Sequence, residues 1–210
     1  MSPEQEPFAT ANPVVHIVDD DDSHRIATSR LLRAAGHATR TYASAGDFLV
    51  THSSMPDGCL LLDLHMPGPN GLALQEALRQ RGWTIPIIFL SGRGDIRSSV
   101  KALKTGAHDF LTKPVDAQTL FEAIATALTA NALAQEKQNQ ERDRQARFAQ
   151  LNAREREVLQ LVLRGTLTRD IASQLRVSDR TIKSCRASIM EKFGANSLAE
   201  LVAKATNTPQ

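Results

Sequence analysis

The sequence has few cysteines, few aromatic residues and no apolar run of membrane-spanning length. Its only cysteines, Cys59 and Cys185, lie far apart in a chain of 210 residues. That spacing indicates neither a disulfide framework nor a cysteine metal site, and it favours a reducing compartment. With 4% aromatic residues, the cores must consist mainly of aliphatic side chains. Residues 1–13 are polar, which favours a cytoplasmic protein that has no signal peptide and no contact with a membrane.

No sign of charge dominates the whole chain, whose net charge is +2, but the charges are unevenly distributed. Residues 1–130 contain 11 Lys and Arg against 14 Asp and Glu, whereas residues 131–210 contain 14 against 9. An acidic first part and a basic second part indicate two roles, with polyanion binding in the second. A chance distribution of surface charge explains the same counts, so the motifs must decide.

Short apolar runs alternate with amphipathic segments from Val14 onwards. Strands interleaved with helices indicate βαβ units, and therefore an α/β fold with a parallel, doubly wound sheet covered on both faces. The predicted strands are residues 14–18, 38–42, 59–62, 85–90 and 109–111. The predicted helices are residues 23–35, 45–51, 71–81 and 96–104, with a fifth helix starting near Asp116.

Reactive side chains follow four of these strands. Asp19 and Asp20 come after the first strand, and Asp63, Ser91 and Lys113 come after the third, fourth and fifth. Because the carboxyl ends of parallel strands meet at one edge of the sheet, we expect these residues to converge there. Three adjacent carboxylates repel one another, and a hard divalent cation, Mg²⁺ or Mn²⁺, removes that conflict.

A metal-bound carboxylate at this edge can act as a nucleophile toward a phosphoryl group, while an ammonium group neutralises the phosphoryl oxygens. Taken alone, each feature has a simpler explanation. An Asp pair after a strand is often a helix N-cap, a Ser is often a turn residue, and a Lys-Pro step is usually a surface loop. Their occurrence together, in this order and each at a strand end, favours the phosphoryl-transfer interpretation.

The same residues resemble the receiver domain of two-component response regulators, over about residues 13–128 of this chain. The loop Asp63-Leu-His-Met-Pro-Gly-Pro-Asn-Gly71 is similar to the phosphorylation loop of that family, and Gly106-Ala107 also matches. The resemblance implies a five-stranded, flavodoxin-like domain whose Asp63 accepts a phosphoryl group from a histidine kinase. It implies that Asp20 and Asp63 bind the metal ion directly, that Asp19 does so largely through water, and that the His65 backbone carbonyl adds a ligand. It also implies that Ser91 and Lys113 contact the phosphoryl oxygens.

The resemblance also implies a switch. Phosphorylation draws the Ser91 hydroxyl inward, Phe110 rotates into the vacated space, and the surface of residues 96–104 and 109–112 changes. In similar proteins this surface pairs two receivers, so we expect a homodimer upon phosphorylation. The alternative for Phe110 is an ordinary core residue. The histidines other than His65 show no ligand spacing, and we expect most of them to be surface or packed residues.

Residues 116–150 contain neither glycine nor proline. The first part is amphipathic and should pack on the sheet, whereas the second part is almost entirely polar. We favour one long helix that leaves a receiver of residues 13–130 and continues as a connector of residues 131–150. A flexible linker is the alternative.

Residues 151–205 form a small all-α domain in this interpretation. Asn152 and Glu155 have the spacing of a capping box, and Gly165 ends the first helix. A short helix at 167–175, a turn, a basic helix at 179–193 with Ser178 as its cap, and a last helix at 197–205 follow. Two helices joined by a turn, the second one basic, match a reader of the DNA major groove. A small bundle with a solvated basic face is the alternative.

The stretch Arg-Glu-Arg-Glu-Val-Leu, Asp170-Ile-Ala and the spacing from Ser178 to Phe193 resemble the LuxR-type helix-turn-helix domain. The resemblance implies that the basic helix lies in the major groove and that the last helix pairs two domains. Cys185 and Thr168 depart from the residues common in the family, His and Asn, which weakens any transfer of base specificity. Base-edge contacts are then expected from Lys183, Ser184 and Ala187, and backbone contacts from Arg180, Thr181 and Arg186, with Lys192 completing the set.

The whole chain is therefore similar to the FixJ-like (NarL/FixJ) response regulators. They are not enzymes but transcription regulators, more often activators, whose partners are a sensor histidine kinase, double-stranded DNA and a second copy, with RNA polymerase as a further partner. A phosphatase with an Asp nucleophile is the first alternative. Such enzymes usually carry a second acid two residues after the nucleophile, and here that position is occupied by His65. A regulator that binds DNA without phosphorylation is the second.

Overall fold

The computed structural model describes residues 13–92 and 96–206 of the chain. The polar start considered above lies outside this range, apart from Pro13. The chain divides into two compact units, Met1–Ala134 and Gln135–Gln210. Among the described residues, no helix combines the length and the apolar character needed to cross a bilayer.

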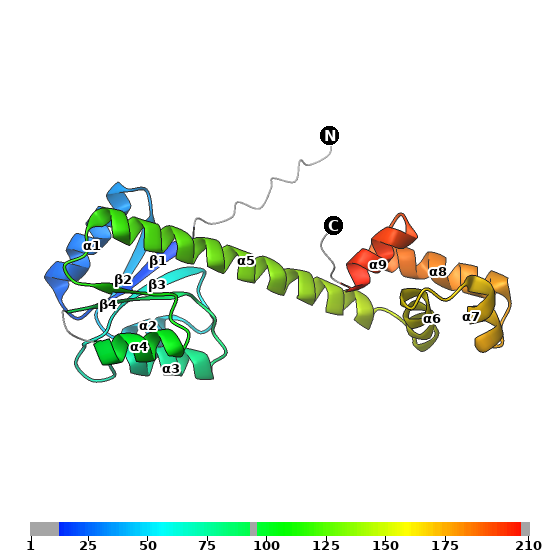
Figure 1. Cartoon of the computed structure of the whole chain (residues 1–210), viewed down its shortest axis with the longest axis horizontal. Helices are drawn as coiled ribbons and strands as arrows, with labels where there is room; N and C mark the ends of the chain where they lie inside the picture. Colours follow the sequence, from blue (N-terminus) through cyan, green and yellow to red (C-terminus); the bar gives the residue numbers. More distant parts are fainter. Residues whose placement is uncertain (1–12, 93–95, 207–210) are drawn as a thin grey trace. The chain divides into compact units, whose positions relative to one another are not determined.

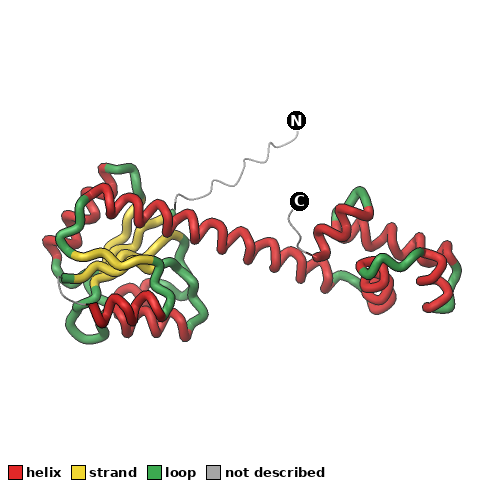
Figure 2. Tube along the Cα trace, viewed as in Figure 1, coloured by secondary structure: helices red, strands yellow, loops and turns green. Residues whose placement is uncertain are grey.

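The first unit contains a five-stranded parallel sheet in the order β2-β1-β3-β4-β5. Figure 2 shows the strands of this sheet in yellow. Strand β1 pairs with both β2 and β3, so the winding direction of the sheet reverses between β1 and β3. Side chains at the carboxyl ends beside this reversal are the ones placed to meet a ligand. The strands are β1 (Val14–Val18), β2 (Ala38–Tyr42), β3 (Gly58–Asp63), β4 (Ile87–Ser91) and β5 (Asp109–Thr112).

Helices cover both faces of the sheet. Figure 1 shows α1 and α5 on one face, and α2, α3 and α4 on the other. Alternate residues of β1 separate the two cores: Ile17 packs with Ile124 of α5, whereas Val18 packs in the cluster that contains Leu74 of α3. The helices are α1 (Asp22–Ala34), α2 (Ala45–Thr51), α3 (Gly71–Gln80), α4 (Ile96–Lys104) and α5 (Ala117–Ala149).

The expected doubly wound architecture is confirmed, with small differences at the element ends. Strand β4 begins at Ile87 rather than at residue 85, because Pro86 has no N–H to donate to a ladder. Asp63 and Ser91 are the last residues of β3 and β4 instead of following them. Asp21 is the N-cap of α1, so the capping explanation applies to one residue of the acidic run.

Helix α5 is continuous over Ala117–Ala149, as favoured from the absence of glycine and proline. Its first part is held by buried apolar side chains such as Ile124 and Ala127. Its polar second part carries internal side-chain pairs instead, for example Arg144 with Glu141 at 2.7 Å. Pairs three or four residues apart stabilise a solvated helix modestly, which accounts for helical structure without apolar packing.

The second unit is built around α6 (Ala153–Leu163), α7 (Thr168–Gln174), α8 (Asp179–Phe193) and α9 (Leu198–Thr206). Its core contains aliphatic residues from all four helices, and Phe193 packs edge-on against Phe148 from the end of α5 at 5.3 Å. The predicted capping box of Asn152 and Glu155 and the Ser178 cap are present. The second and fourth helices both begin one residue later than predicted, at Thr168 and Leu198.

Candidate functional site

Three carboxylates meet at the carboxyl ends of β1 and β3. Asp19, Asp20 and Asp63 each place a carboxylate oxygen within 4.8 Å of the other two. Asp19 and Asp63 are buried, whereas Asp20 is exposed. The sequence prediction that these residues converge is therefore reproduced by the sheet geometry.

Lys113 is the cation of this cluster. It follows β5, and its backbone N–H donates to the carbonyl of Ser91 at 2.7 Å. Its ammonium group lies 3.0 Å from Asp19 Oδ2 and 3.0 Å from Asp63 Oδ1. One ammonium group thus bridges two carboxylates that would otherwise repel each other.

The compensation by Lys113 is incomplete. Burial raises the pKa of Asp63, Lys113 opposes that effect, and the charges of Asp19 and Asp20 add to it, so the pKa stays above the ordinary value. Burial alone would lower the pKa of Lys113, but its bonds to Asp63 and Asp19 outweigh burial and raise it. Three carboxylates against one ammonium group leave an excess of negative charge, and clustered carboxylate oxygens are the ligand type of a hard divalent cation.

His24 is a member of this site that sequence reasoning missed. It lies in the first turn of α1, and its Nδ1 donates to Asp19 Oδ2 at 2.6 Å, the oxygen that also accepts from Lys113. Its lack of ligand spacing predicts only a surface or packed residue. The available signal was its place one turn into the helix that follows Asp19 and Asp20.

The start of α3 packs tightly against Asp63 and Phe89. A Cβ on Gly71 would lie 2.5 Å from the Asp63 carbonyl oxygen and 2.9 Å from the Phe89 ring, so the start of α3 requires glycine. His65 lies in the loop between these two elements with an exposed side chain. Gly71 of the loop motif is therefore required for steric reasons.

Ser91 and Phe110 occupy neighbouring strands. Ser91 ends β4, is fully buried, and its Oγ lies 3.4 Å from the Gly92 carbonyl. Phe110 in β5 is half-buried and packs against Phe89 with ring centroids 6.2 Å apart. The sequence permits either a switch residue or an ordinary core residue at Phe110, and its half-buried position is compatible with both.

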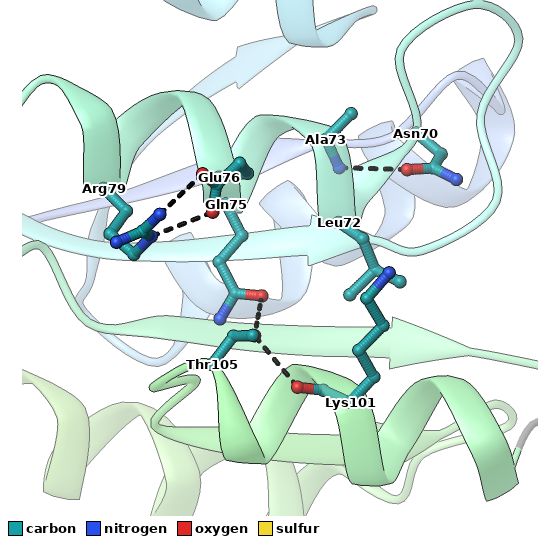
Figure 3. A pocket seen from close by; sticks show the side chains of 8 residues that line it. All are labelled: Asn70, Leu72, Ala73, Gln75, Glu76, Arg79, Lys101 and Thr105. Carbon is teal, nitrogen blue, oxygen red and sulfur yellow. Dashed lines mark hydrogen bonds and ion pairs between the residues drawn. The ribbon is translucent and has the colours of Figure 1, made fainter.

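A hollow of about 410 Å³ lies between α3 and α4 (Figure 3). Gln75 and Thr105 point toward each other across it, with the Thr105 hydroxyl donating to Gln75 Oε1 at 2.7 Å. Gln75 also donates to the carbonyl of Ala102 at 3.2 Å. These bonds tie the carboxyl end of α4 to α3, so any rearrangement of α4 must work around that attachment.

The candidate nucleic-acid interface lies on α8. Arg180, Lys183, Ser184 and Ala187 are exposed, whereas Thr181 and Arg186 are half-buried. The Arg186 guanidinium donates to Thr168 Oγ1 at 2.8 Å, which links α8 to α7. The exposed basic face is therefore concentrated in the first half of the helix.

Lys192 has an internal partner. Its ammonium group lies 2.6 Å from Glu155 of α6, which also accepts from the Ser188 hydroxyl and the Asn152 N–H. The hydrogen bond from Lys192, ahead of those from Asn152 and Ser188, lowers the pKa of Glu155 to about 2. We therefore assign Lys192 to the packing of α6 against α8 rather than to the exposed basic face.

Two family models match the chain, one in each unit. Residues 15–125 match the response regulator receiver domain, and residues 149–205 match the bacterial regulatory proteins of the luxR family. Together they cover both the acidic cluster and the basic helix.

The chain is also similar to whole response regulators over most of its length. The chain is 41% identical over 189 residues to the response regulator protein TmoT of Ectopseudomonas mendocina, covering 90% of this chain and 86% of that protein. It is 38% identical to the tetrathionate response regulatory protein TtrR of Salmonella typhimurium, covering 90% and 89%. Among solved structures, the response regulator StyR aligns over 94% of this chain and 100% of its own, with 39% identity and a TM-score of 0.86.

Proposed function

The chain belongs to the two-component response regulators that join a receiver domain to a LuxR-type DNA-binding domain, and from this premise we propose that phosphorylation of Asp63 switches its binding to DNA. We assign residues 13–130 to the receiver, 131–150 to the connecting helix and 151–205 to the DNA-binding domain. The donor of the phosphoryl group is the phosphohistidine of a sensor kinase.

The observation that carries this proposal is the position of Asp63 between Lys113 and the carboxylates of Asp19 and Asp20. An oxygen of Asp63 attacks the phosphorus atom, the P–N bond of the phosphohistidine breaks, and its electron pair returns to the imidazole. The product is an acyl phosphate on Asp63. Lys113 lies within hydrogen-bond distance of the nucleophile and neutralises charge on the arriving phosphoryl oxygens.

The acidic cluster suits Mg²⁺, or Mn²⁺, with Asp19, Asp20, Asp63 and the His65 carbonyl as the groups that would hold it. When bound, the ion supplies positive charge opposite the phosphoryl oxygens. His24 and Lys113 share one oxygen of Asp19, and the Asp21 N–H donates to the other at 2.9 Å. These bonds orient the Asp19 carboxylate.

Ser91 and Phe110 couple phosphorylation of Asp63 to the surface formed by α4 and β5. The Ser91 hydroxyl moves inward to the phosphoryl group, Phe110 fills the released space, and α4 with β5 changes arrangement. Helix α4 already exposes Val100 and Leu103, apolar side chains suited to pairing with a second copy. We propose that phosphorylation promotes a homodimer through this surface, and that RNA polymerase is a later partner on DNA.

In the DNA-binding domain, α8 lies in the major groove. Lys183, Ser184 and Ala187 face base edges, while Arg180, Thr181 and Arg186 lie nearer phosphates. Lys183 is suited to guanine O6 and N7, and the short side chains of Ser184 and Ala187 allow close approach. Lys192 is left out because its ammonium group is bound to Glu155.

Intact-protein mass spectrometry tests the first step. We expect a small-molecule phosphodonor with Mg²⁺ to add one phosphoryl group to the wild-type chain. We expect no phosphoryl group on Asp63→Asn, nor on the wild type when a chelator removes Mg²⁺. Asp47→Asn, which changes an exposed carboxylate of α2, is the matched control and should be modified like the wild type. A phosphoryl group found on Asp63→Asn as well would overturn the assignment.

A further inference from the structure

Within the described residues, six helices end in the same backbone motif. In each, the N–H of a left-handed residue donates to the carbonyl three residues before it, and the next N–H donates to the carbonyl five residues before itself. This pair of bonds satisfies carbonyls that the end of the helix leaves open, and the left-handed position favours glycine. The motif closes α1, α3, α4, α6, α7 and α8.

Five of the six left-handed positions are glycine, with φ between 58° and 95°: Gly36, Gly82, Gly106, Gly165 and Gly194. A Cβ at any of them would meet nothing within 4 Å. Glycine therefore stands there for its backbone conformation and not because space is short. An L-residue in the same place would carry the strain of a left-handed backbone without relieving any crowding.

The sixth position is Arg176, after α7. Its φ is 55°, and it is the only non-glycine residue with positive φ among the described residues. The Arg176 N–H donates to Ser173 at 3.3 Å and the Val177 N–H to Ala172 at 3.0 Å, so the motif is otherwise the same. A strained backbone at one of six equivalent sites indicates that the side chain contributes something that the fold does not need.

The surroundings show what the side chain offers. Arg176 is exposed, and within the described part of the chain its guanidinium makes no hydrogen bond or ion pair. It lies in the turn between the two helices of the helix-turn-helix, two residues before Ser178 caps α8. The exposed Arg180 and Lys183 follow on the first turns of α8. The acids of this region, Asp170 and Asp179, are exposed as well.

We propose that Arg176 is a DNA-backbone contact that binds a phosphate flanking the groove entered by α8. This inference rests on the proposed DNA-binding function and adds a residue that the basic face of α8 does not contain. In helix-turn-helix proteins the first helix crosses the backbone and the start of the second helix enters the groove, so the turn between them lies beside phosphates. Arginine suits that position because its planar guanidinium matches phosphate oxygens.

The full-length chain, treated with a phosphodonor, tests the proposal by anisotropy with two labelled duplexes of unrelated sequence over a series of salt concentrations. We expect Arg176→Gly to bind both duplexes severalfold more weakly and to reduce the slope of log affinity against log salt by about 0.9 per bound protomer. Because the lost contact is to a DNA phosphate and not to a base, the loss of affinity should be the same for both duplexes. The thermal midpoint of the DNA-binding domain should meanwhile rise by a few degrees.

Two further variants make the result specific. Arg176→Lys keeps the charge and should retain the salt slope. Arg142→Gln removes an exposed arginine from the connecting helix and should leave affinity within about twofold, since charges that contact no phosphate contribute little. If wild type binds DNA and Arg176→Gly keeps the same salt slope, this inference is overturned while the proposed function stands. If the wild-type chain binds no duplex at all, both are overturned.

Discussion

The ammonium group of Lys192 in α8 lies 2.6 Å from the carboxylate of Glu155 in α6, and this ion pair joins two helices at the centre of the DNA-binding domain. Glu155 is buried and holds three donors at once, those of Lys192, Ser188 and the Asn152 backbone. The residue that forms the capping box of α6 thus also fixes α8, so the two helices are oriented by one carboxylate.

Replacing Glu155 by Gln should destabilise this domain by about 1.5–3 kcal/mol, because charge-assisted hydrogen bonds are lost. The hydrogen bond from Lys192 is the largest cause that lowers the pKa of Glu155 to about 2. A lowered folded pKa means stabilisation that is complete above the ordinary value of 4.5 and lost as the pH falls toward 2. Denaturant unfolding between pH 7 and 2 measures this, with the exposed Glu157→Gln as control. An equal acid dependence in Glu155→Gln and wild type would contradict it.

His16 should make the receiver acid-sensitive. It is buried beside Tyr42, and its Nδ1 forms a hydrogen bond of 3.0 Å with the Tyr42 hydroxyl. Burial lowers the pKa of His16 to about 4. Since the unfolded residue binds a proton near pH 6.5, stability is lost as the pH falls from about 6.5 to 4, by up to about 2–3 kcal/mol. His16→Gln should be less stable at pH 7, and its free energy of unfolding should change less with pH across that interval. His108→Gln, at an exposed histidine, should retain the wild-type slope.

Asn131 attaches helix α5 to the loop before β3. This buried residue of α5 donates to Asp57 Oδ1 at 2.7 Å, in the loop before β3. Asn131→Asp places a second carboxylate against the first, and should lower receiver stability by about 1–3 kcal/mol through the lost donor. Asn139→Asp makes the same change at an exposed position of the same helix and should alter stability by less than about 0.5 kcal/mol. Equal midpoints for the two variants in urea unfolding would refute the role of Asn131.

Helix α7 offers a stabilising change. Leu167 is its N-cap residue, is 71% exposed, and provides no side-chain cap among the described hydrogen bonds. Leu167→Ser should raise the stability of the DNA-binding domain by about 0.5–2 kcal/mol by accepting from a free N–H of the first turn. Calorimetry of the full chain measures the shift. Ser178→Ala, which removes the existing cap of α8, should lower the same transition, and a rise in both variants would contradict the capping argument.

The sequence predicts most of the fold because its local signals agree with one another. Alternating apolar runs place the strands, and Asp63, Ser91 and Lys113 converge because parallel strands end at one edge. The start of β4 was predicted two residues early, since apolar character continues through Pro86 while hydrogen bonding does not. Pattern and hydrogen-bond pairing are different physical properties, and only the second defines the strand.

The contacts that the sequence could not supply are those between side chains distant in the chain. The bond of Lys192 to Glu155 spans 37 residues, and the basic spacing of α8 suggests DNA for every cation on it. The bond of His24 to Asp19 spans only five residues, but it depends on how α1 follows β1, which the residue types alone do not specify. Arg176 appears in the sequence only as part of a turn, because residue types alone do not specify its left-handed φ of 55°.

Control of DNA binding by Asp63 is tested most directly by comparing the wild-type chain with Asp63→Asn, each with and without a small-molecule phosphodonor and Mg²⁺. The probe is duplex DNA recovered by affinity selection with the phosphorylated wild type. If phosphorylation of Asp63 controls DNA binding, the phosphodonor increases the affinity of the wild type at least tenfold, or about 1.4 kcal/mol, and leaves the affinity of Asp63→Asn unchanged. A wild-type affinity that does not respond to the phosphodonor, or an equal response in Asp63→Asn, would contradict it.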